Sequence, residues 1–243
     1  MRRMLLLAAL LAGLASPARA NFEDGRAAYE RGDYGAALRE FKVAAERGDD
    51  RAQMALGFMY DRGDGVAVDH AAAIRWYRKA AEQGHAGAEN GLGEMYAGGR
   101  GVPRDEREAA KWFRRAAERG NPVAQNNLGR ACAMGLGVAR DHREAIAWFR
   151  RSADQGYPEG QLNLGLAYAN GHGVAPNPVA AYKWISIAAK HLSAGPHREL
   201  VARERDRLAR ILTPAEIAEA ERLASQWSQQ AASAPQGAGP GSD

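Results

Sequence analysis

The chain has 243 residues, of which 33 are Lys or Arg and 29 are Asp or Glu, so its formal net charge is +4. Aromatic residues make up only 7% and glycines number 28, a composition that favours many short helices over one large globular core. Residues 1–20 hold three arginines and no acid, so 30 basic and 29 acidic residues remain without them. These charges interleave, which argues against nucleic acid as a partner because such binding needs basic charge clustered on one face.

The first 20 residues are predicted to be an export signal. Two arginines precede an apolar run from 4 to 14, and residues 18–20 (Ala-Arg-Ala) have the small-x-small pattern of a cleavage site. The apolar run is shorter than the roughly 20 residues that span a bilayer, and no later segment is apolar enough. We therefore expect cleavage after Ala20, a periplasmic or secreted protein, and no stable membrane insertion once the signal is removed.

Residues 21–51 are predicted to form a helical hairpin that caps the N-terminal end of the following units. The turn at 31–34 (Arg-Gly-Asp-Tyr) separates Tyr29 from Phe41 and the alanine pair at 44–45. This register resembles a tetratricopeptide hairpin with a shortened loop.

From residue 52 the sequence matches itself at an offset of 36 residues, in the units 52–87, 88–123, 124–159 and 160–195. A Leu-Gly pair, a Gly-x-Gly-Val loop and a tryptophan recur in every unit without an insertion. A fixed period of about 20–50 residues is typical of solenoids and arrays. The predicted fold is therefore all-α, an α-solenoid of tandem helix-turn-helix repeats.

Each unit is expected to contain two helices. The loop glycines end the first helix, and Asp69, Asp105 and Asp141 begin the second helix as N-caps. A single hairpin cannot cover its own apolar face, so stacking against the neighbouring units must bury it. The predicted core residues are Leu56, Tyr60, Trp76, Leu92, Tyr96, Trp112, Leu128, Trp148, Leu164, Tyr168 and Trp184.

These landmarks resemble the Sel1-like repeat, a tetratricopeptide-like family. Its pattern runs Ala-x-x-x-Leu-Gly-x-x-Tyr, Gly-x-Gly-Val, Asp, then Ala-x-x-Trp-Tyr/Phe-x-x-Ala-Ala-x-x-Gly. Cys132 departs from it in place of the tyrosine, and Asn177 in place of the capping aspartate. For a bacterial exported protein, the resemblance implies a non-enzymatic scaffold or adaptor of the cell envelope with a protein or peptide partner.

After the repeats, residues 196–230 are predicted to form two capping helices. Thr213 and Glu216 have the spacing of a capping box, with Pro214 at the first helical position. These helices are amphipathic, so contact with a partner or a membrane surface is an alternative. Residues 231–243 are rich in Pro, Gly and Ser, and we expect them to be disordered.

No motif for catalysis or cofactor binding is present. The chain has no Walker loop, dinucleotide fingerprint, zincin motif or Gly-x-Ser-x-Gly elbow. Of the six histidines only His70 and His142 share a repeat position, and the two repeat lengths between them separate them around the superhelix, so no metal site is predicted. Cys132 is expected to be a buried structural residue. Some cysteine-rich Sel1-like proteins are linked to β-lactamase activity, but Ser-x-x-Lys and paired cysteines are missing here. We predict no catalytic residue, cofactor or metal.

In the related tetratricopeptide architecture the first helices line a concave groove. Asn90 and Asn126 are then expected to hydrogen-bond an extended peptide, Arg130 to pair with a carboxylate, and Met54 and Phe58 to form an apolar pocket. The predicted groove residues are Met54, Phe58, Asp61, Asn90, Glu94, Asn126, Arg130, Met134, Leu162, Leu166 and Asn170.

Two alternatives stay open at this point. The protein is a rigid spacer that binds through its ends or its convex face, or it is a module or hydrolase that acts on peptidoglycan-type cell-wall ligands. The residues do not predict an oligomeric state.

Overall fold

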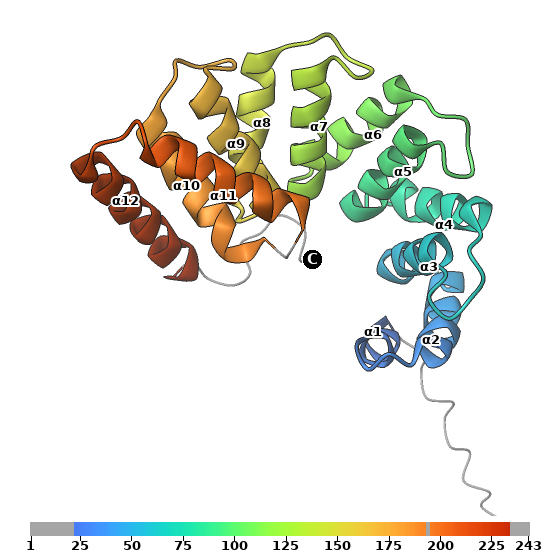
Figure 1. The fold of residues 1–243 in the computed structure, drawn as a ribbon. Coiled ribbons are helices and arrows are strands. Elements are labelled where there is room, and N and C mark those ends of the chain that lie inside the picture. The colour runs from blue at the N-terminus through green and yellow to red at the C-terminus, as the bar shows by residue number, and fades with distance from the viewer. Residues whose placement is uncertain (1–21, 193–194, 234–243) are drawn as a thin grey trace, which may run out of the picture.

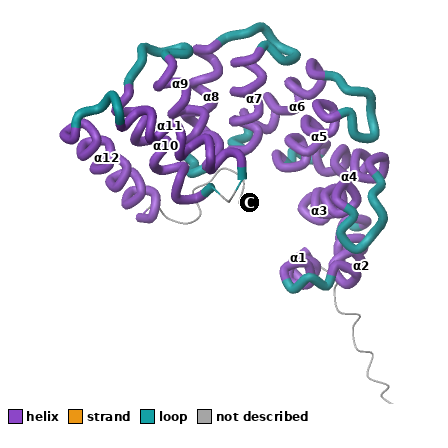
Figure 2. Tube along the Cα trace, viewed as in Figure 1, coloured by secondary structure: helices purple, strands orange, loops and turns teal. Residues whose placement is uncertain are grey.

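The computed structural model describes residues 22–192 and 195–233 of the chain. Within them it contains twelve α-helices and no strand, which confirms the predicted all-α solenoid (Figures 1 and 2). The predicted export signal, residues 1–20, and residues 234–243 of the predicted tail lie outside the described part. No described helix combines the length and the apolar character that crossing a membrane requires.

The four predicted repeats form four helical hairpins. Their helices are α3 (Asp50–Arg62) and α4 (His70–Glu82), α5 (Ala86–Gly98) and α6 (Glu106–Glu118), α7 (Pro122–Met134) and α8 (His142–Asp154), and α9 (Pro158–Asn170) and α10 (Pro178–His191). Each first helix begins two residues before the predicted start of its unit. The hairpins stack into an arc, and the long loop within each hairpin follows the outer edge of this arc (Figure 1).

The helix ends follow from the residues that recur there. Asp69, Asp105 and Asp141 each accept a hydrogen bond from a backbone N–H of the first helical turn, as predicted for N-caps, and Asn177 does the same. At the other end, Gly63 closes α3 in the left-handed conformation at φ 81°, which favours glycine. The equivalent glycines close α5, α7 and α9.

The two helices of a hairpin approach closely at the glycine that follows the repeat leucine. A Cβ atom at Gly57 would lie 2.5 Å from the ring of Tyr77, so the ring of α4 occupies the space that a side chain on α3 would need. The other repeats have the same pairing, in Gly93 with Phe113, Gly129 with Phe149 and Gly165 with Ile185. Glycine at this position therefore allows the close packing.

The N-terminal hairpin packs like a repeat with a shorter loop. It consists of α1 (Phe22–Glu30) and α2 (Tyr34–Glu46), joined by residues 31–33, whereas residues 63–69 join α3 to α4. A Cβ atom at Gly25 would lie 2.6 Å from the ring of Phe41, which is the same approach as in the repeats.

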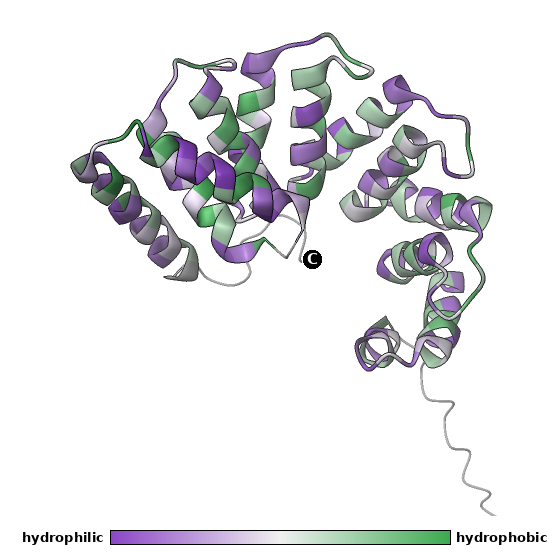
Figure 3. Ribbon diagram, viewed as in Figure 1, coloured by the Kyte–Doolittle hydropathy of each residue, from purple (hydrophilic) through white to green (hydrophobic). Residues whose placement is uncertain are grey.

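The predicted core is confirmed for the leucines and differs for some aromatic residues. Leu56, Leu92, Leu128 and Leu164 are fully buried. Trp148 and Trp184 are also buried, whereas Trp76, Trp112 and the three predicted core tyrosines are only half-buried. The residue after each tryptophan, aromatic in the first three repeats and Ile185 in the fourth, faces the glycine of its own hairpin. The tryptophan itself lies nearer the surface under a basic side chain, as Trp112 does 4.5 Å from the guanidinium of Arg115. Figure 3 shows apolar and polar residues on the same helices throughout the arc.

The two C-terminal helices pack on the last repeat from different sides. Helix α11 (Pro196–Ala209) contacts α9 and α10, and α12 (Pro214–Ser233) packs along α10. Trp227 of α12 lies edge-on to Trp184 of α10, with ring centroids 5.7 Å apart. The predicted capping box is present, because Glu216 accepts a hydrogen bond from the backbone N–H of Thr213. Helix α12 continues three residues beyond the predicted end at residue 230.

Candidate functional site between the first helices of the second and third repeats

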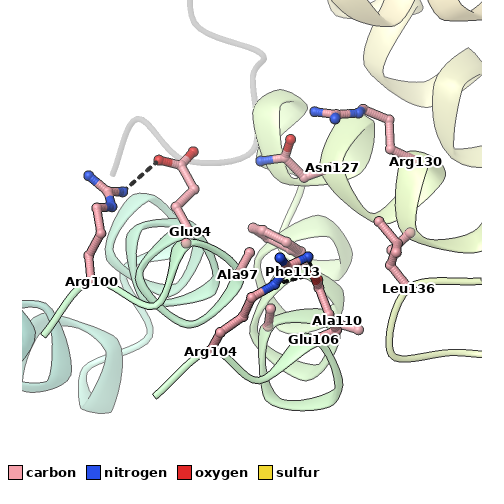
Figure 4. Close-up of a pocket in the computed structure, with 13 residues that line it drawn as sticks. Glu94, Ala97, Arg100, Arg104, Glu106, Ala110, Phe113, Asn127, Arg130 and Leu136 are labelled. Carbon is pink, nitrogen blue, oxygen red and sulfur yellow. Dashed lines mark hydrogen bonds and ion pairs between the residues drawn. The ribbon is translucent and has the colours of Figure 1, made fainter. Parts of the chain in front are cut away.

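A pocket of about 470 Å³ opens between α5, α6 and α7 (Figure 4). Helices α5 and α7 form its sides, α6 contributes residues from its buried face, and the loops after α5 and α7 complete it. Its apolar lining consists of Ala97, Gly98, Ala109, Ala110, Phe113, Ala131 and Leu136. Its polar lining consists of Glu94, Arg100, Arg104, Glu106, Asn127 and Arg130. The pocket therefore has an apolar interior with charged residues around it.

The charged residues around the pocket are mostly paired with one another or with nearby groups. The guanidinium of Arg100 donates to both carboxylate oxygens of Asp61 at 2.7 and 2.8 Å. Arg104 Nε donates to Glu106 at 2.9 Å. Arg130 is exposed and forms no ion pair within the described residues, and its side chain extends toward Asn127 (Figure 4). Arg130 is thus the rim cation that is free to bind a ligand.

Three of the predicted groove residues are not accessible, so this part of the prediction was wrong. Asn90 and Asn126 are 8% and 3% exposed, and Leu162 is 3% exposed. The side chains of Asn90 and Asn126 point along the stack toward the next first helix instead of into a groove. Asn127 Nδ2 donates to Asn90 Oδ1 at 3.1 Å, which joins α5 to α7, and Asn163 Nδ2 donates to Asn126 Oδ1 at 2.8 Å, which joins α7 to α9.

The remaining groove residues divide into two groups. Glu94, Arg130, Met134 and Asn170 are exposed, and Met134 is 62% exposed. Of these four, Glu94 and Arg130 line the pocket. Met54, Phe58, Asp61 and Leu166 are partly buried. Leu162 and Leu166 belong to the apolar cluster that includes Val201 and Leu208 of α11, so this capping helix covers the predicted groove at the last repeat.

Cys132 is fully buried, as expected. Burial is the main reason that the pKa of its thiol is raised from 9.0 to about 11. In the second and fourth repeats a tyrosine at this position accepts a hydrogen bond from an arginine of the preceding second helix, as Tyr96 accepts from Arg78 at 3.0 Å. Arg114 has no such tyrosine to bind, and it donates to Glu144 at 2.8 Å instead.

No group of three or more metal-ligating side chains in the described ranges is arranged to hold a metal ion. His142 and His172 stack with ring centroids 5.1 Å apart, although they lie at different positions of their repeats.

Sequence reasoning missed most of the pocket, although the repeat alignment contained a signal for it. Ala110 stands where the other units have Ile74, Ile146 and Tyr182, all of which are buried. An unusually small residue at a position that is otherwise filled by a large one predicts a hollow.

Comparison with known proteins agrees with this architecture. The family model of the Sel1 repeat matches residues 50–85, 86–121, 122–157 and 158–191, which together are more than half of the chain. These matches begin where α3, α5, α7 and α9 begin. No curated protein matches the sequence.

Several solved structures are similar to this one. A protective antigen of uropathogenic Escherichia coli strains, with an SLR fold, is 35% identical with a TM-score of 0.76; the match covers 87% of this chain but only 45% of that protein. A Sel1 repeat protein from Oxalobacter formigenes is 30% identical with a TM-score of 0.67, over 87% of this chain and 84% of that one. An immunity protein from Pseudomonas aeruginosa, at 20% identity and a TM-score of 0.53 over 85% of this chain and 83% of that one, shares the fold.

Proposed function

This chain belongs to the Sel1 repeat family, whose members generally mediate protein–protein interactions, and we propose that it is a scaffold of the bacterial cell envelope that binds a segment of a partner protein. The proposed binding surface is the pocket between α5, α6 and α7. The observation that carries this proposal is the pocket itself, which combines an apolar interior with Arg130, a cation that has no ion pair among residues 22–192 and 195–233.

The location in the envelope is supported by the first 20 residues. The two N-terminal arginines, the apolar run from 4 to 14 and the Ala-Arg-Ala at 18–20 are the features of a cleaved export signal. Fractionation of cells that express the chain with a C-terminal tag tests this part of the proposal. We expect a product that begins at Asn21, by mass spectrometry, in the periplasm or the medium. A full-length product in the cytoplasm would contradict the assigned location.

Partner binding is tested by purification from an envelope extract, with the chain from Asn21 onward as bait. A partner should be recovered, should bind again when both proteins are purified, and should be lost with a Glu94→Ala/Arg130→Glu variant. Both substituted residues are exposed, so this variant should retain the fold. Substitutions of Asn90 or Asn126 are unsuitable here because both side chains are buried between helices.

The scaffold role would be contradicted if the bait protein bound to insoluble cell wall and recovered no protein partner. Retention of the same partner by the Glu94→Ala/Arg130→Glu variant would instead place the contact on another surface of the arc.

A further inference from the structure

The pocket between α5, α6 and α7 has two properties that bear on its ligand. Small side chains line its apolar part, and Arg130 at its rim forms no ion pair within the described residues. We propose that it is the specificity pocket of the partner-binding surface, which takes one apolar side chain of a partner segment together with a neighbouring carboxylate that pairs with Arg130. This inference rests on the proposed function, because it assumes that the ligand is a segment of a protein.

The missing volume begins on α6. In the first and third repeats, Ile74 and Ile146 occupy the position of Ala110, and they are 4% and 9% exposed. In the fourth repeat Tyr182 fills it and is 5% exposed. At this position the other hairpins thus place a large buried side chain, whereas the second repeat has Ala110, which lines the pocket and is itself only 2% exposed. A partner side chain inserted there would make the van der Waals contacts that isoleucine makes in the neighbouring units.

Two further small residues widen the same space from the flanking helices. Ala131 of α7 stands where the first two repeats have Met59 and Met95, both fully buried. Gly98, at the end of α5, stands where the third repeat has Met134. The hollow is therefore bordered by a shortened side chain on each of its three helices, and all three residues line the pocket.

The size of the pocket limits what can enter. Ligand pockets for small molecules hold about 300–1,000 Å³, and this one, at about 470 Å³, lies toward the lower end. An aliphatic side chain with its adjoining backbone fits this volume, whereas a packed helix does not.

The charge at the rim favours an acidic neighbour for that side chain. Arg100 pairs with Asp61 and lies 4.0 Å from Glu94, and Arg104 pairs with Glu106, while Glu94 also accepts a hydrogen bond from Asn90 at 2.9 Å. Arg130 has no ion pair in the part of the chain that the structure describes, and it is exposed beside the opening. A carboxylate placed there gains a charge-assisted, bidentate contact without displacing an existing partner of the guanidinium.

Selection from a phage-displayed library of random dodecapeptides tests the inference. The target is the chain from Asn21 onward, and clones are then compared on three variants. Ala110→Ile fills the hollow with the residue that two neighbouring repeats carry. Arg130→Glu reverses the rim charge. Ala167→Met is the matched control, because it restores the methionine of Met59 and Met95 at the same repeat position outside the pocket. Circular dichroism and thermal unfolding verify that each variant is folded.

We expect the wild-type protein to enrich peptides with a Leu, Ile or Met next to an Asp or Glu. These peptides should bind Ala110→Ile and Arg130→Glu at least about tenfold more weakly and Ala167→Met equally well. A new selection on Arg130→Glu should enrich Lys or Arg in place of the acidic residue. Should Ala110→Ile fail to fold, the charge preference of Arg130→Glu still decides the outcome.

The results that overturn the inference differ from those that overturn the proposed function. Enriched peptides that bind all three variants equally would remove the pocket from the interaction and leave the scaffold role intact. Peptides that copy this chain's own sequence would reassign the pocket to a second copy of the protein. A wild-type protein that enriches no peptide would contradict segment binding, and with it both proposals.

Discussion

Glu89 of α5 and Arg119 at the end of α6 form an ion pair, with 3.2 Å between Glu89 Oε2 and Arg119 Nε. The carboxylate is fully buried, and Arg115 also contacts it at 2.9 Å. The first and third repeats place two glutamines at the same two positions, which bond to each other: Gln53 with Gln83, and Gln125 with Gln155. The second repeat has thus replaced a neutral hydrogen-bonded pair with a charged one.

We predict that Glu89 and Arg119 can be replaced without loss of stability only when both are substituted together. Arg119→Ala removes one partner of a buried carboxylate and should lower the free energy of unfolding by about 1–3 kcal/mol. The double variant Glu89→Gln/Arg119→Gln restores the glutamine pair and should remain within about 0.5 kcal/mol of the wild type. Urea unfolding measures both. Arg75→Ala, an exposed cation with no ion pair in the described structure, is the control. A double variant as unstable as Arg119→Ala would refute the pairing.

Substitution by alanine should have different effects on stability at two helical glycines, Gly93 and Gly35. At Gly93 the new Cβ would lie 2.5 Å from the ring of Phe113, so Gly93→Ala should destabilise the protein by about 1–3 kcal/mol through overpacking. At Gly35 the nearest side-chain atom is 3.8 Å away, and Gly35→Ala should be neutral or stabilising by about 0.5 kcal/mol. Thermal unfolding of both variants measures the difference. Equal effects would show that close helix approach is not the role of Gly93.

Asparagines 126 and 170, both expected in the groove, should differ in their contribution to stability. Asn126 accepts a hydrogen bond from Asn163 in a buried contact, so Asn126→Ala should cost about 1–2 kcal/mol. Asn170 is exposed at the end of α9, and Asn170→Ala should change stability by less than about 0.5 kcal/mol. Urea unfolding with both variants decides between a structural role and a surface role for Asn126.

The buried thiol of Cys132 should make the folded protein less stable in alkali. Its pKa is raised to about 11, whereas an unfolded cysteine ionises near pH 8.5. The native state therefore holds the proton longer, and the stability that the neutral thiol contributes is complete below about pH 8.5 and is lost as the pH rises toward 11. We expect the wild type to lose more stability over this range than Cys132→Ala. The thiol should also resist modification at pH 8 until urea unfolds the chain; rapid modification of the native protein would contradict its burial.

The sequence predicted the repeats because their physical requirements recur at a fixed spacing. The buried leucines, the N-capping aspartates and the loop glycines each satisfy a local need that is the same in every hairpin. These features lie where they were expected, and the family match covers the same residues.

The binding surface could not be predicted in the same way, because it depends on how successive hairpins are rotated. The residue two before each repeat leucine was expected to face a groove. The rotation turns it toward the next first helix, where Asn90 and Asn126 are buried. The pocket could not be predicted from motifs for another reason. It depends on the small side chain of Ala110, whereas a motif consists of the residues that recur.

The origin of the pocket has a consequence for how such a scaffold acquires new specificities. Each hairpin contacts chiefly its immediate neighbours, so shortening Ala110, Gly98 and Ala131 relative to their counterparts alters one place in the arc and leaves the rest unchanged. In this architecture a new binding specificity can therefore arise when large side chains are replaced by smaller ones. Under the proposed function, shorter side chains in two adjacent units would open a site for a partner, and isoleucine at position 110 would fill it, while the remaining units keep their packing.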